Sequence, residues 1–321
     1  MKHLLLADIG GSNARFAVLA DDALGPVRSF DVRTFPTISD SVRHFLADDA
    51  ERSAIDGAVF AVAGPVVGER CALTNSPWIV DAADLCQEFG LKTARLLNDH
   101  EALAWGLPHL APSETVVVGP DRPVADAPMA LVGPGTGLGM ACLVRGPGDA
   151  RVVASEGGHA TLAAATERED ALVTALRRQF GHVSAERVLS GDGLVNLYQA
   201  TAALDGVAVP SRTAAEVSRA GVDGTCVTCR QALDTFCAWL GAVAGDVALL
   251  FGARGGVFIG GGIVPRFVGY LGTTEFRARF EAKGRLSRYL AAIPVRVIVR
   301  PDPAFVGLAA FVRARAGQAG A

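Results

Sequence analysis

The residues best placed to do chemistry begin with Asp8, an acid at the end of an apolar stretch. It is followed at once by Ile9, Gly10, Gly11 and Ser12. Glycine lets backbone N–H groups approach a phosphate without interference from a Cβ atom, and a carboxylate can hold Mg²⁺ directly or through water. The pattern indicates phosphate chemistry, although two glycines alone are more typical of an ordinary β-hairpin turn. Its spacing matches neither the dinucleotide-binding glycine motif nor the P-loop.

Asp99 is a second acid at a structural transition, because a strand is expected to end at Asn98 and a helix to follow. The simplest interpretation is that Asp99 caps the helix. A carboxylate at the carboxyl end of a strand, where ligands bind in α/β folds, can also accept a proton from a hydroxyl group. Such general-base assistance is worth about 10²–10⁴-fold, or roughly 3–5 kcal/mol of barrier. Capping and catalysis are compatible.

Residues 133–139 hold four glycines in seven positions, between two apolar stretches. This is more glycine than a plain turn needs, and the hydroxyl of Thr136 can donate to a phosphate oxygen. Gly135, Thr136 and Gly137 therefore form a candidate phosphate cradle. The alternative is a flexible hairpin tip.

Gly260, Gly261 and Gly262 end another apolar run, which begins at Gly255. Backbone without side chains offers a flat surface, so a nucleoside could lie against it. Tight packing of a strand on the following helix would explain the same glycines. The run alone does not decide between these two interpretations.

Glu156 and His159 bracket two glycines and can point into one pocket. A carboxylate and a neutral imidazole together suit hydrogen bonding to neighbouring hydroxyl groups. A zinc site is a weaker interpretation, because no second ligand pair has the spacing of metal ligands. A third acid, Glu186, would by itself be interpreted as a solvated surface residue, and residues 190–193 as a turn before a helix.

Cys226 and Cys229 have the spacing of half a zinc site or of a redox motif. No second pair follows, and the segment falls in an expected helix that contains Leu233, Phe236 and Leu240. We interpret the two cysteines mainly as packing residues. The six cysteines are scattered through 321 residues, which is not the density of a disulfide scaffold and favours a reduced, cytoplasmic setting.

Strands and helices must alternate to place these residues. Two helix starts are marked by the capping-box spacing, at Thr166 with Glu169 and at Thr213 with Glu216, and Gly181 ends the first helix. Apolar runs of strand character lie between the helical patterns, which predicts an α/β protein. These runs cover residues 3–8, 15–19, 57–64, 115–119, 129–133, 138–144, 255–259 and 295–299.

The chain contains a weak internal echo. Residues 4–19 read as strand, glycine turn and strand, and residues 129–144 repeat that plan. Two such hairpins predict a duplicated fold with two lobes and a cleft between them. The boundary is expected near residues 107–112, with a C-terminal strand and helix crossing back. We therefore expect a small domain of residues 1–109 plus 300–321 and a large domain of residues 110–299.

Composition excludes several classes of protein. Half of the residues are hydrophobic and 20% are charged, so the chain can bury a core and is not disordered. Its 37 glycines follow no collagen period. The net charge is −3 with no basic block, which is not typical of a nucleic-acid-binding protein. Apolar residues 127–144 are broken by glycines and residues 235–253 contain Asp246, so neither predicts a membrane span.

Six motifs occur in an order that resembles bacterial glucokinase of the proteobacterial type, in the hexokinase/actin-like superfamily. The resemblance runs from Met1 to the region of Phe305. It implies a duplicated actin-like (ribonuclease H-like) fold, with two lobes of mixed sheets flanked by helices and an interlobe cleft. The motifs are residues 8–15, 97–99, 135–139, 156–159, 186–191 and 255–266.

The resemblance also implies an activity, the ATP-dependent phosphorylation of D-glucose to glucose 6-phosphate, which feeds glycolysis. Asp99 would be the general base on the sugar 6-hydroxyl, and Asp8 would hold Mg²⁺ through water. The implied glucose contacts are Asn98, Asp99, Glu156, His159 and Glu186. The implied ATP contacts are Ala7, Asp8, Ile9, Gly10, Gly11, Ser12, Gly135, Thr136 and Gly137 at the phosphates and Gly260, Gly261 and Gly262 at the adenosine. Ser12 stands where the family usually has threonine, and it keeps the hydroxyl.

Three alternatives are open. The first is a kinase for another hexose, such as mannose, fructose or an N-acetylated amino sugar. The second is a sugar-responsive regulator, which would carry a helix-turn-helix before the first strand, whereas that strand starts at His3. The third is an actin-like assembly protein, which would not need the implied sugar contacts. The zinc-binding cysteine motif of the repressor/kinase group is absent. We expect a cytoplasmic homodimer that binds neither nucleic acid nor membranes.

Overall fold

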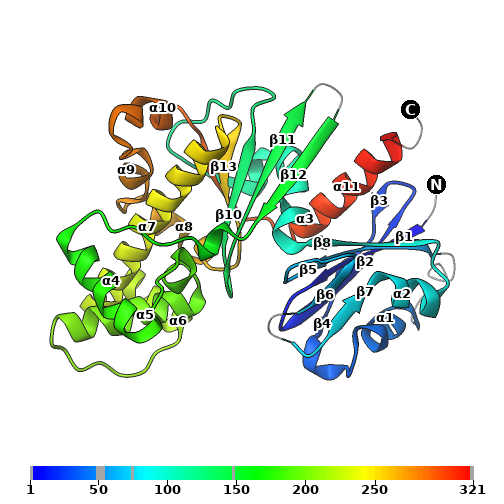
Figure 1. The fold of residues 1–321 in the computed structure, drawn as a ribbon, viewed down its shortest axis with the longest axis horizontal. Coiled ribbons are helices and arrows are strands. Elements are labelled where there is room, and N and C mark those ends of the chain that lie inside the picture. Colours follow the sequence, from blue (N-terminus) through cyan, green and yellow to red (C-terminus); the bar gives the residue numbers. More distant parts are fainter. Residues whose placement is uncertain (1–2, 48–54, 74–75, 147–148, 319–321) are drawn as a thin grey trace. The chain divides into compact units, whose positions relative to one another are not determined.

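The computed structural model describes residues 3–47, 55–73, 76–146 and 149–318. The chain folds into two compact units. Unit 1 comprises residues 1–111 together with residues 300–321, and unit 2 comprises residues 112–299. Each unit is a mixed sheet with helices packed on it, and Figure 1 shows the element order in colour.

The sheet of unit 1 is built on an antiparallel hairpin of β1 and β2, to which β5 and β8 are added parallel to β1. The order is β3-β2-β1-β5-β8, and β4 also pairs with β2. The strands are β1 (His3–Ile9), β2 (Asn13–Ala20), β3 (Ala23–Leu24), β4 (Arg28–Asp31), β5 (Ile55–Val62) and β8 (Thr93–Asn98). A separate ribbon pairs β6 (Arg70–Ala72) with β7 (Ile79–Asp81).

Helices cover both faces of this sheet (Figure 1). One face carries α1 (Ile38–Ala47) and α2 (Ala82–Phe89), and the other carries α3 (Asp99–Gly106) and α11 (Ala304–Gln318). The pair α3 and α11 lies in backbone contact, because a Cβ atom added at Gly307 would overlap the carbonyl oxygen of Ala102. Glycine at position 307 is therefore what lets the C-terminal helix dock on unit 1.

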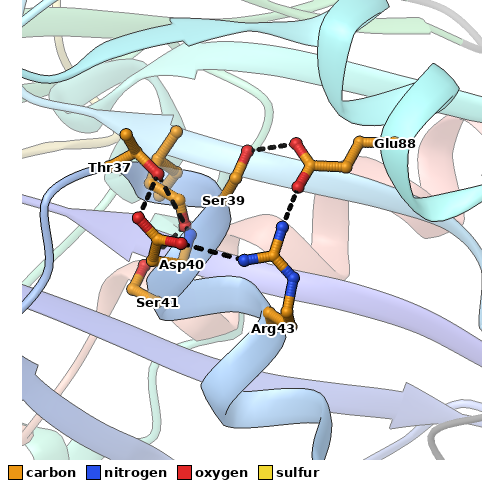
Figure 2. Close-up of polar contacts among 7 residues, drawn as sticks. Thr37, Ser39, Asp40, Ser41, Arg43 and Glu88 are labelled. Carbon is orange, nitrogen blue, oxygen red and sulfur yellow. Dashed lines mark hydrogen bonds and ion pairs between the residues drawn. The ribbon is translucent and has the colours of Figure 1, made fainter.

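A polar network joins α1 to α2 on the surface of unit 1 (Figure 2). Ser39 Oγ donates to Glu88 Oε2 at 2.6 Å, and the guanidinium of Arg43 pairs with the same carboxylate. Arg43 also contacts Asp40 at 2.9 Å, and Asp40 accepts from Thr37 Oγ1 at 2.7 Å. Because these groups are exposed, we expect the network to add only a few tenths of a kcal/mol per pair.

The sheet of unit 2 repeats the plan of unit 1. Its order is β12-β11-β10-β13-β14-β9, in which β10 and β11 form the antiparallel hairpin and β13 and β14 are added in parallel. The strands are β9 (Thr115–Val118), β10 (Met129–Pro134), β11 (Leu138–Gly146), β12 (Asp149–Ser155), β13 (Gly256–Ile259) and β14 (Val295–Ile298). The series β11-β10-β13-β14 thus matches β2-β1-β5-β8, which confirms the duplication predicted from the sequence echo.

The helices of unit 2 gather around α7 (Val227–Phe251), which packs against the sheet (Figure 1). It also packs against α5 (Gly191–Leu204), α6 (Ala214–Asp223) and α9 (Phe276–Glu281). Among the described residues α7 alone is long and apolar enough to cross a membrane, and 61% of its apolar window is buried in the structure. Phe236, Trp239 and Leu240 lie in the same core as Val132 and Val257. The apolar stretch at residues 235–253 is thus used for packing.

The remaining helices of unit 2 are α4 (Glu167–Phe180), α8 (Val268–Leu271) and α10 (Ser287–Ala291). Short 3₁₀ turns occur at η1 (Val32–Thr34), η3 (Leu107–His109), η4 (Pro112–Glu114), η5 (Gly157–His159), η6 (Ala185–Arg187), η7 (Val264–Phe267) and η8 (Gly284–Leu286). The two 3₁₀ turns η5 and η6 carry residues of the candidate site.

One of the two predicted capping boxes is complete and the other is half formed. At α6, Thr213 and Glu216 exchange both hydrogen bonds of the box. At α4, Thr166 Oγ1 accepts from Glu169 N at 3.2 Å, but the Glu169 carboxylate accepts from Ala165 N at 2.7 Å instead of from the cap residue. The Glu169 side chain does not reach the backbone of Thr166 because it is buried and pairs with Arg279, whose Nη1 lies 2.6 Å from Glu169 Oε1.

Candidate functional site

Asp8 lies next to the last residue of β1, at the sheet edge where the parallel strands β1, β5 and β8 all end. The hairpin register sets it opposite Arg15, which donates to Asp8 Oδ2 at 2.9 Å. Arg15 also pairs with Asp302 at 3.1 Å. Burial raises the pKa of Asp8, the positive charge of Arg15 opposes that rise, and the negative charges of Asp99 and Asp302 add to it.

The turn after β1 presents backbone donors. Gly10 N donates to Asn13 O at 2.9 Å, and Ser12 O accepts from Val32 N at 3.0 Å. Within the described ranges, the N–H groups of Gly11 and Ser12 have no backbone acceptor. Gly11 is half-buried and Ser12 is exposed. Two adjacent amide donors are thus free to bind an anion beside Asp8.

Asn98, and not Asp99, is the N-cap of α3, which corrects the capping interpretation of Asp99. Asn98 Oδ1 accepts from His100 N at 3.0 Å and from Glu101 N at 3.3 Å, and Asn98 Nδ2 donates to Gly64 O at 3.3 Å. Because Asn98 accepts from the first backbone N–H groups of α3, the Asp99 carboxylate is not needed as the helix cap. It is available for another role at the end of β8.

Contacts with His100 lower the pKa of Asp99. Asp99 Oδ1 lies 2.9 Å from His100 Nδ1 and accepts from His100 N at 2.8 Å. Burial by itself would raise the pKa of Asp99, but the charge of His100 and these hydrogen bonds outweigh burial and lower that pKa. A carboxylate ionised at neutral pH can accept a proton from a hydroxyl group.

Unit 2 holds the glycine turn between β10 and β11 through Glu186, a residue of η6. Glu186 Oε2 accepts from Leu138 N at 2.9 Å, and a Cβ atom at Gly137 would lie 2.6 Å from the same oxygen. Gly135 N donates to Gly137 O, and Gly135 O accepts from Gly191 N at 2.9 Å. Glu186 is therefore part of the turn's support and not an isolated surface acid.

Glu156 is the N-cap residue of the 3₁₀ turn η5 and His159 is its last residue, and the turn lies against β11. A Cβ atom at Gly158 would overlap the carbonyl oxygen of Leu138, so the chain needs glycine to approach this closely. The segment is joined to η6 by the hydrogen bond from Ala185 N to Ala160 O at 2.9 Å. The structure thus brings the segments of Glu156, His159 and Glu186 together, and the side chains of the first two are exposed.

The glycines after β13 lie at the end of β10. Gly260 N donates to Val132 O at 2.9 Å. Gly261 has a positive φ of +77°, and a Cβ atom there would overlap the carbonyl oxygen of Pro134. No heavy atom lies within 4 Å of a Cβ placed at Gly262, so this position faces open space. Gly261 thus packs tightly against the end of β10, whereas Gly262 is open.

Each unit thus gathers its own part of the candidate site at the carboxyl edge of its parallel strands. Unit 1 gathers Asp8, the turn at residues 10–12, Asn98 and Asp99. Unit 2 gathers the segments at residues 135–137, 156–159, 186 and 260–262. Sequence reasoning missed Arg15, Asp302 and His100 as partners of the two acids. Only Arg15 had a signal, because a hairpin with its turn at residues 10–12 places residue 15 opposite residue 8.

A sheet of one hairpin and two parallel strands that occurs twice, with glycine turns and carboxylates at the carboxyl edges, defines the duplicated α/β fold of the actin-like kinases. A model of the glucokinase family matches residues 5–315. The glucokinase of Paramagnetospirillum magneticum is 48% identical over 314 residues, covering 96% of this chain and 97% of the relative. The chain belongs to the glucokinase family.

Solved structures agree with this assignment. A glucokinase from an Antarctic psychrotroph has a TM-score of 0.88 and 36% identity, covering 98% of this chain and 99% of that one. A glucokinase of the ROK family from Streptomyces griseus, in complex with glucose and AMPPNP, has a TM-score of 0.64 and 21% identity, covering 97% and 98%. At that identity the second likeness is one of fold.

Proposed function

We propose that this protein transfers the γ-phosphoryl group of ATP to the 6-hydroxyl of D-glucose and so forms glucose 6-phosphate for glycolysis. The observation that carries the proposal is Asp99, a half-buried carboxylate whose pKa is lowered by its contacts with His100. The neighbouring Asn98 caps the helix, so Asp99 does not have to. In a family named for glucose phosphorylation, such a group is the base that aligns and deprotonates the attacking hydroxyl. Units 1 and 2 would be the small and large domains of the enzyme.

Each residue proposed to contact the sugar keeps a polar group available for it. Asn98 Nδ2 donates one of its two hydrogens to Gly64 O, which leaves the second for a sugar hydroxyl. Glu156, the residue before η5, and His159, the last residue of η5, are exposed and offer an acceptor and an imidazole to neighbouring hydroxyls. Glu186 keeps one carboxylate oxygen for the sugar while the other accepts from Leu138 N.

ATP contacts are assigned to the glycine segments. The free amides of Gly11 and Ser12, on a turn that also includes Gly10, and the exposed hydroxyl of Thr136 suit phosphate oxygens. Gly135 and Gly137 allow that approach in unit 2, and the open position at Gly262, next to Gly260 and Gly261, suits the adenosine. The end of β1, from Ala7 to Ile9, supports the first turn.

Asp8 is suited to hold Mg²⁺ through water. One of its oxygens is engaged by Arg15, which leaves the other as an acceptor for a metal-bound water. Mg²⁺ usually keeps several waters and binds through one or two carboxylates plus substrate phosphates. Within the described ranges no group of three or more potential ligand side chains could hold a metal, and a single carboxylate fits that mode. When bound, Mg²⁺ offsets charge on the phosphates.

Asp99→Asn tests the proposal. We expect glucose affinity to be nearly unchanged and kcat to fall by at least about 10²-fold, because the amide cannot accept the proton. A coupled assay of glucose 6-phosphate formation measures kcat, and equilibrium binding measures affinity. Asp84→Asn, an exposed acid in the first turn of α2, is the matched control and should leave turnover unchanged. Near-normal turnover of Asp99→Asn would refute the assignment.

The choice of sugar needs its own test, because one hydroxyl or methyl group is a weak discriminator in some pockets. Phosphate transfer is measured with ATP over a panel of glucose, mannose, fructose and N-acetylglucosamine. We expect glucose to have the highest kcat/KM, and a strong preference for another hexose would overturn the assignment of glucose as the substrate.

We also propose that the protein is a cytoplasmic homodimer. Sedimentation of the purified chain tests the homodimer, and fractionation of cells tests the cytoplasmic location.

A further inference from the structure

Cys226 and Cys229 occupy the first turn of α7, at a position that the proposed function does not use. Cys226 is the N-cap of the helix, with extended backbone, and its Sγ accepts from Cys229 N at 3.4 Å. Both thiols are free in the structure. Cys229 is fully buried, whereas Cys226 is half-buried at the border of the same core, so solvent reaches part of Cys226 but not Cys229.

The corner that carries the two cysteines is held firmly. Arg230, one residue beyond Cys229, donates from Nε to Gly221 O and from Nη2 to Val222 O, both at 3.0 Å, at the end of α6. A Cβ atom at Gly221 would lie 3.0 Å from Cys229 O, so the backbone of the two helices is in close contact. On this firmly held corner, Cys226 Sγ lies 3.4 Å from the backbone nitrogen of Cys229, the residue that carries the second sulfur.

The surroundings favour the thiolate at one of the two sulfurs. Burial alone would raise the pKa of Cys226, but hydrogen bonds from the Cys229 amide and thiol and the positive charge of Arg212 lower it. Burial and the neighbouring Cys226 raise the pKa of Cys229. Arg212 Nε is itself buried without a hydrogen-bond partner in the described part of the chain. A reactive sulfur and a protonated one thus stand side by side.

A metal does not explain the pair. Within the described ranges no cluster of three or more His, Cys, Asp or Glu side chains could hold a metal ion. A half-buried sulfur at a helix N-terminus with a second, buried cysteine three residues further on is an arrangement in which thiol–disulfide chemistry occurs.

We propose that Cys226 and Cys229 form a reversible dithiol–disulfide pair, in which Cys226 is oxidised first by a peroxide and Cys229 resolves the product. The Cys226 thiolate attacks one oxygen of hydrogen peroxide, the O–O bond breaks, and Cys226 becomes a sulfenic acid while hydroxide leaves. The Cys229 thiol then attacks the Cys226 sulfur, the S–O bond breaks, and water leaves with the Cys229 proton. The two thiols lose two electrons, and the peroxide gains them.

Trypsin makes the pair directly measurable, because cleavage after Arg219 and Arg230 releases residues 220–230 with both cysteines and no other. The full-length reduced protein is treated with hydrogen peroxide, quenched with N-ethylmaleimide and analysed by mass spectrometry. We expect this peptide to lose two hydrogens and to resist alkylation, and dithiothreitol to restore both thiols. The readout does not depend on sugar phosphorylation. A negative result would therefore contradict the disulfide proposal without affecting the proposed function.

Single variants of the two cysteines test which sulfur is oxidised first. Cys229→Ser should trap a sulfenic acid on Cys226, detected with dimedone, and Cys229→Ala repeats the test without a buried hydroxyl. Cys226→Ser keeps a good N-cap, so the fold is retained, and the remaining Cys229 should stay unmodified. Cys86, half-buried within α2, is the internal control for general thiol reactivity. Oxidation of Cys86 as fast as Cys226, or accumulation of sulfinic acid on Cys226 in the unmodified sequence, would overturn the proposal.

Discussion

Asn98 and Asp99 divide two tasks that a single acid often combines. The amide closes the helix start, and contacts with His100 lower the pKa of the carboxylate next to it. Sequence alone predicts that this pair is important, because it joins a strand to a helix. It cannot tell which of the two residues caps, since Asn and Asp are about equally good caps and the choice depends on local backbone angles.

Gly137 is the residue through which the glycine turn and Glu186 depend on each other. Gly137→Ala would place a Cβ atom 2.6 Å from Glu186 Oε2 and displace that carboxylate, the flexible partner in the contact. We expect KM for glucose to rise by about 10-fold or more, since a hydrogen bond to a charged group is worth about 1.5–3 kcal/mol. Steady-state kinetics with varied glucose measures it. Gly269→Ala, where no atom lies within 4 Å of the Cβ, should leave KM unchanged.

The acid side of the pH profile reports the environment of Asp8. Its pKa is raised and that of Asp99 is lowered, so Asp8 is protonated first as the pH falls. Arg15→Gln removes the charge that lowers the pKa of Asp8, so the acid limb of kcat/KM for MgATP should move to higher pH. Asp302→Asn removes a charge that raises it and should move the limb to lower pH. Shifts in the same direction would contradict this account of Asp8.

Strands with continuous apolar runs were predictable as elements, and the eight expected runs all correspond to strands. The edge strand β12 was not predicted, because its residues do not form an apolar run and Val153 is 45% exposed. The ribbon β6–β7 has three residues in each strand, too few for a periodic pattern. The start of α4 was predictable from Thr166, whereas the partner of Glu169 lies more than a hundred residues away on α9.

The contact between α3 and α11 gives an element-scale prediction. Gly307→Ala introduces a Cβ that overlaps Ala102 O and must push the two helices apart, so we expect a loss of about 1–3 kcal/mol of unfolding free energy. Denaturant unfolding measures it, with fluorescence of Trp105, whose ring lies 5.7 Å from Phe311 on α11, as one probe. Gly272→Ala, at a site with room for a Cβ, should unfold like the unmodified protein. Equal stability of the two variants would show that the helices adjust freely.

The ion pair between Glu169 and Arg279 fastens α4 to α9. Both side chains are largely buried, at 6% and 12% exposure, and Arg279 donates to both carboxylate oxygens. Arg279→Met strands the buried Glu169 charge and should cost about 3–5 kcal/mol. The double variant with Glu169→Gln should recover part of that loss, as measured by thermal and denaturant unfolding. A double variant no more stable than the single one would argue against a stranded charge.

At the scale of the whole molecule, the echo between residues 4–19 and 129–144 was enough to predict a duplicated fold. The sequence similarity between these two segments could not predict the side-chain contacts between residues that are far apart in the sequence. Glu186 reaches Leu138 across 48 positions, and Arg15 reaches Asp302 across almost the whole chain. Such pairs follow from how strand ends converge at a sheet edge, and no local pattern in the sequence encodes them.

The discontinuity of unit 1 has a consequence for the order of events during synthesis. Residues 112–299 form one continuous stretch and can fold as soon as they leave the ribosome. Unit 1 must wait with the α3 surface uncovered, because α11 belongs to it and is made after all of unit 2. At about 5–20 residues per second, unit 2 alone takes roughly 10–40 s to emerge. We expect the side of α3 that α11 covers in the folded protein to be accessible to chaperones, and to other unfolded chains, during that time.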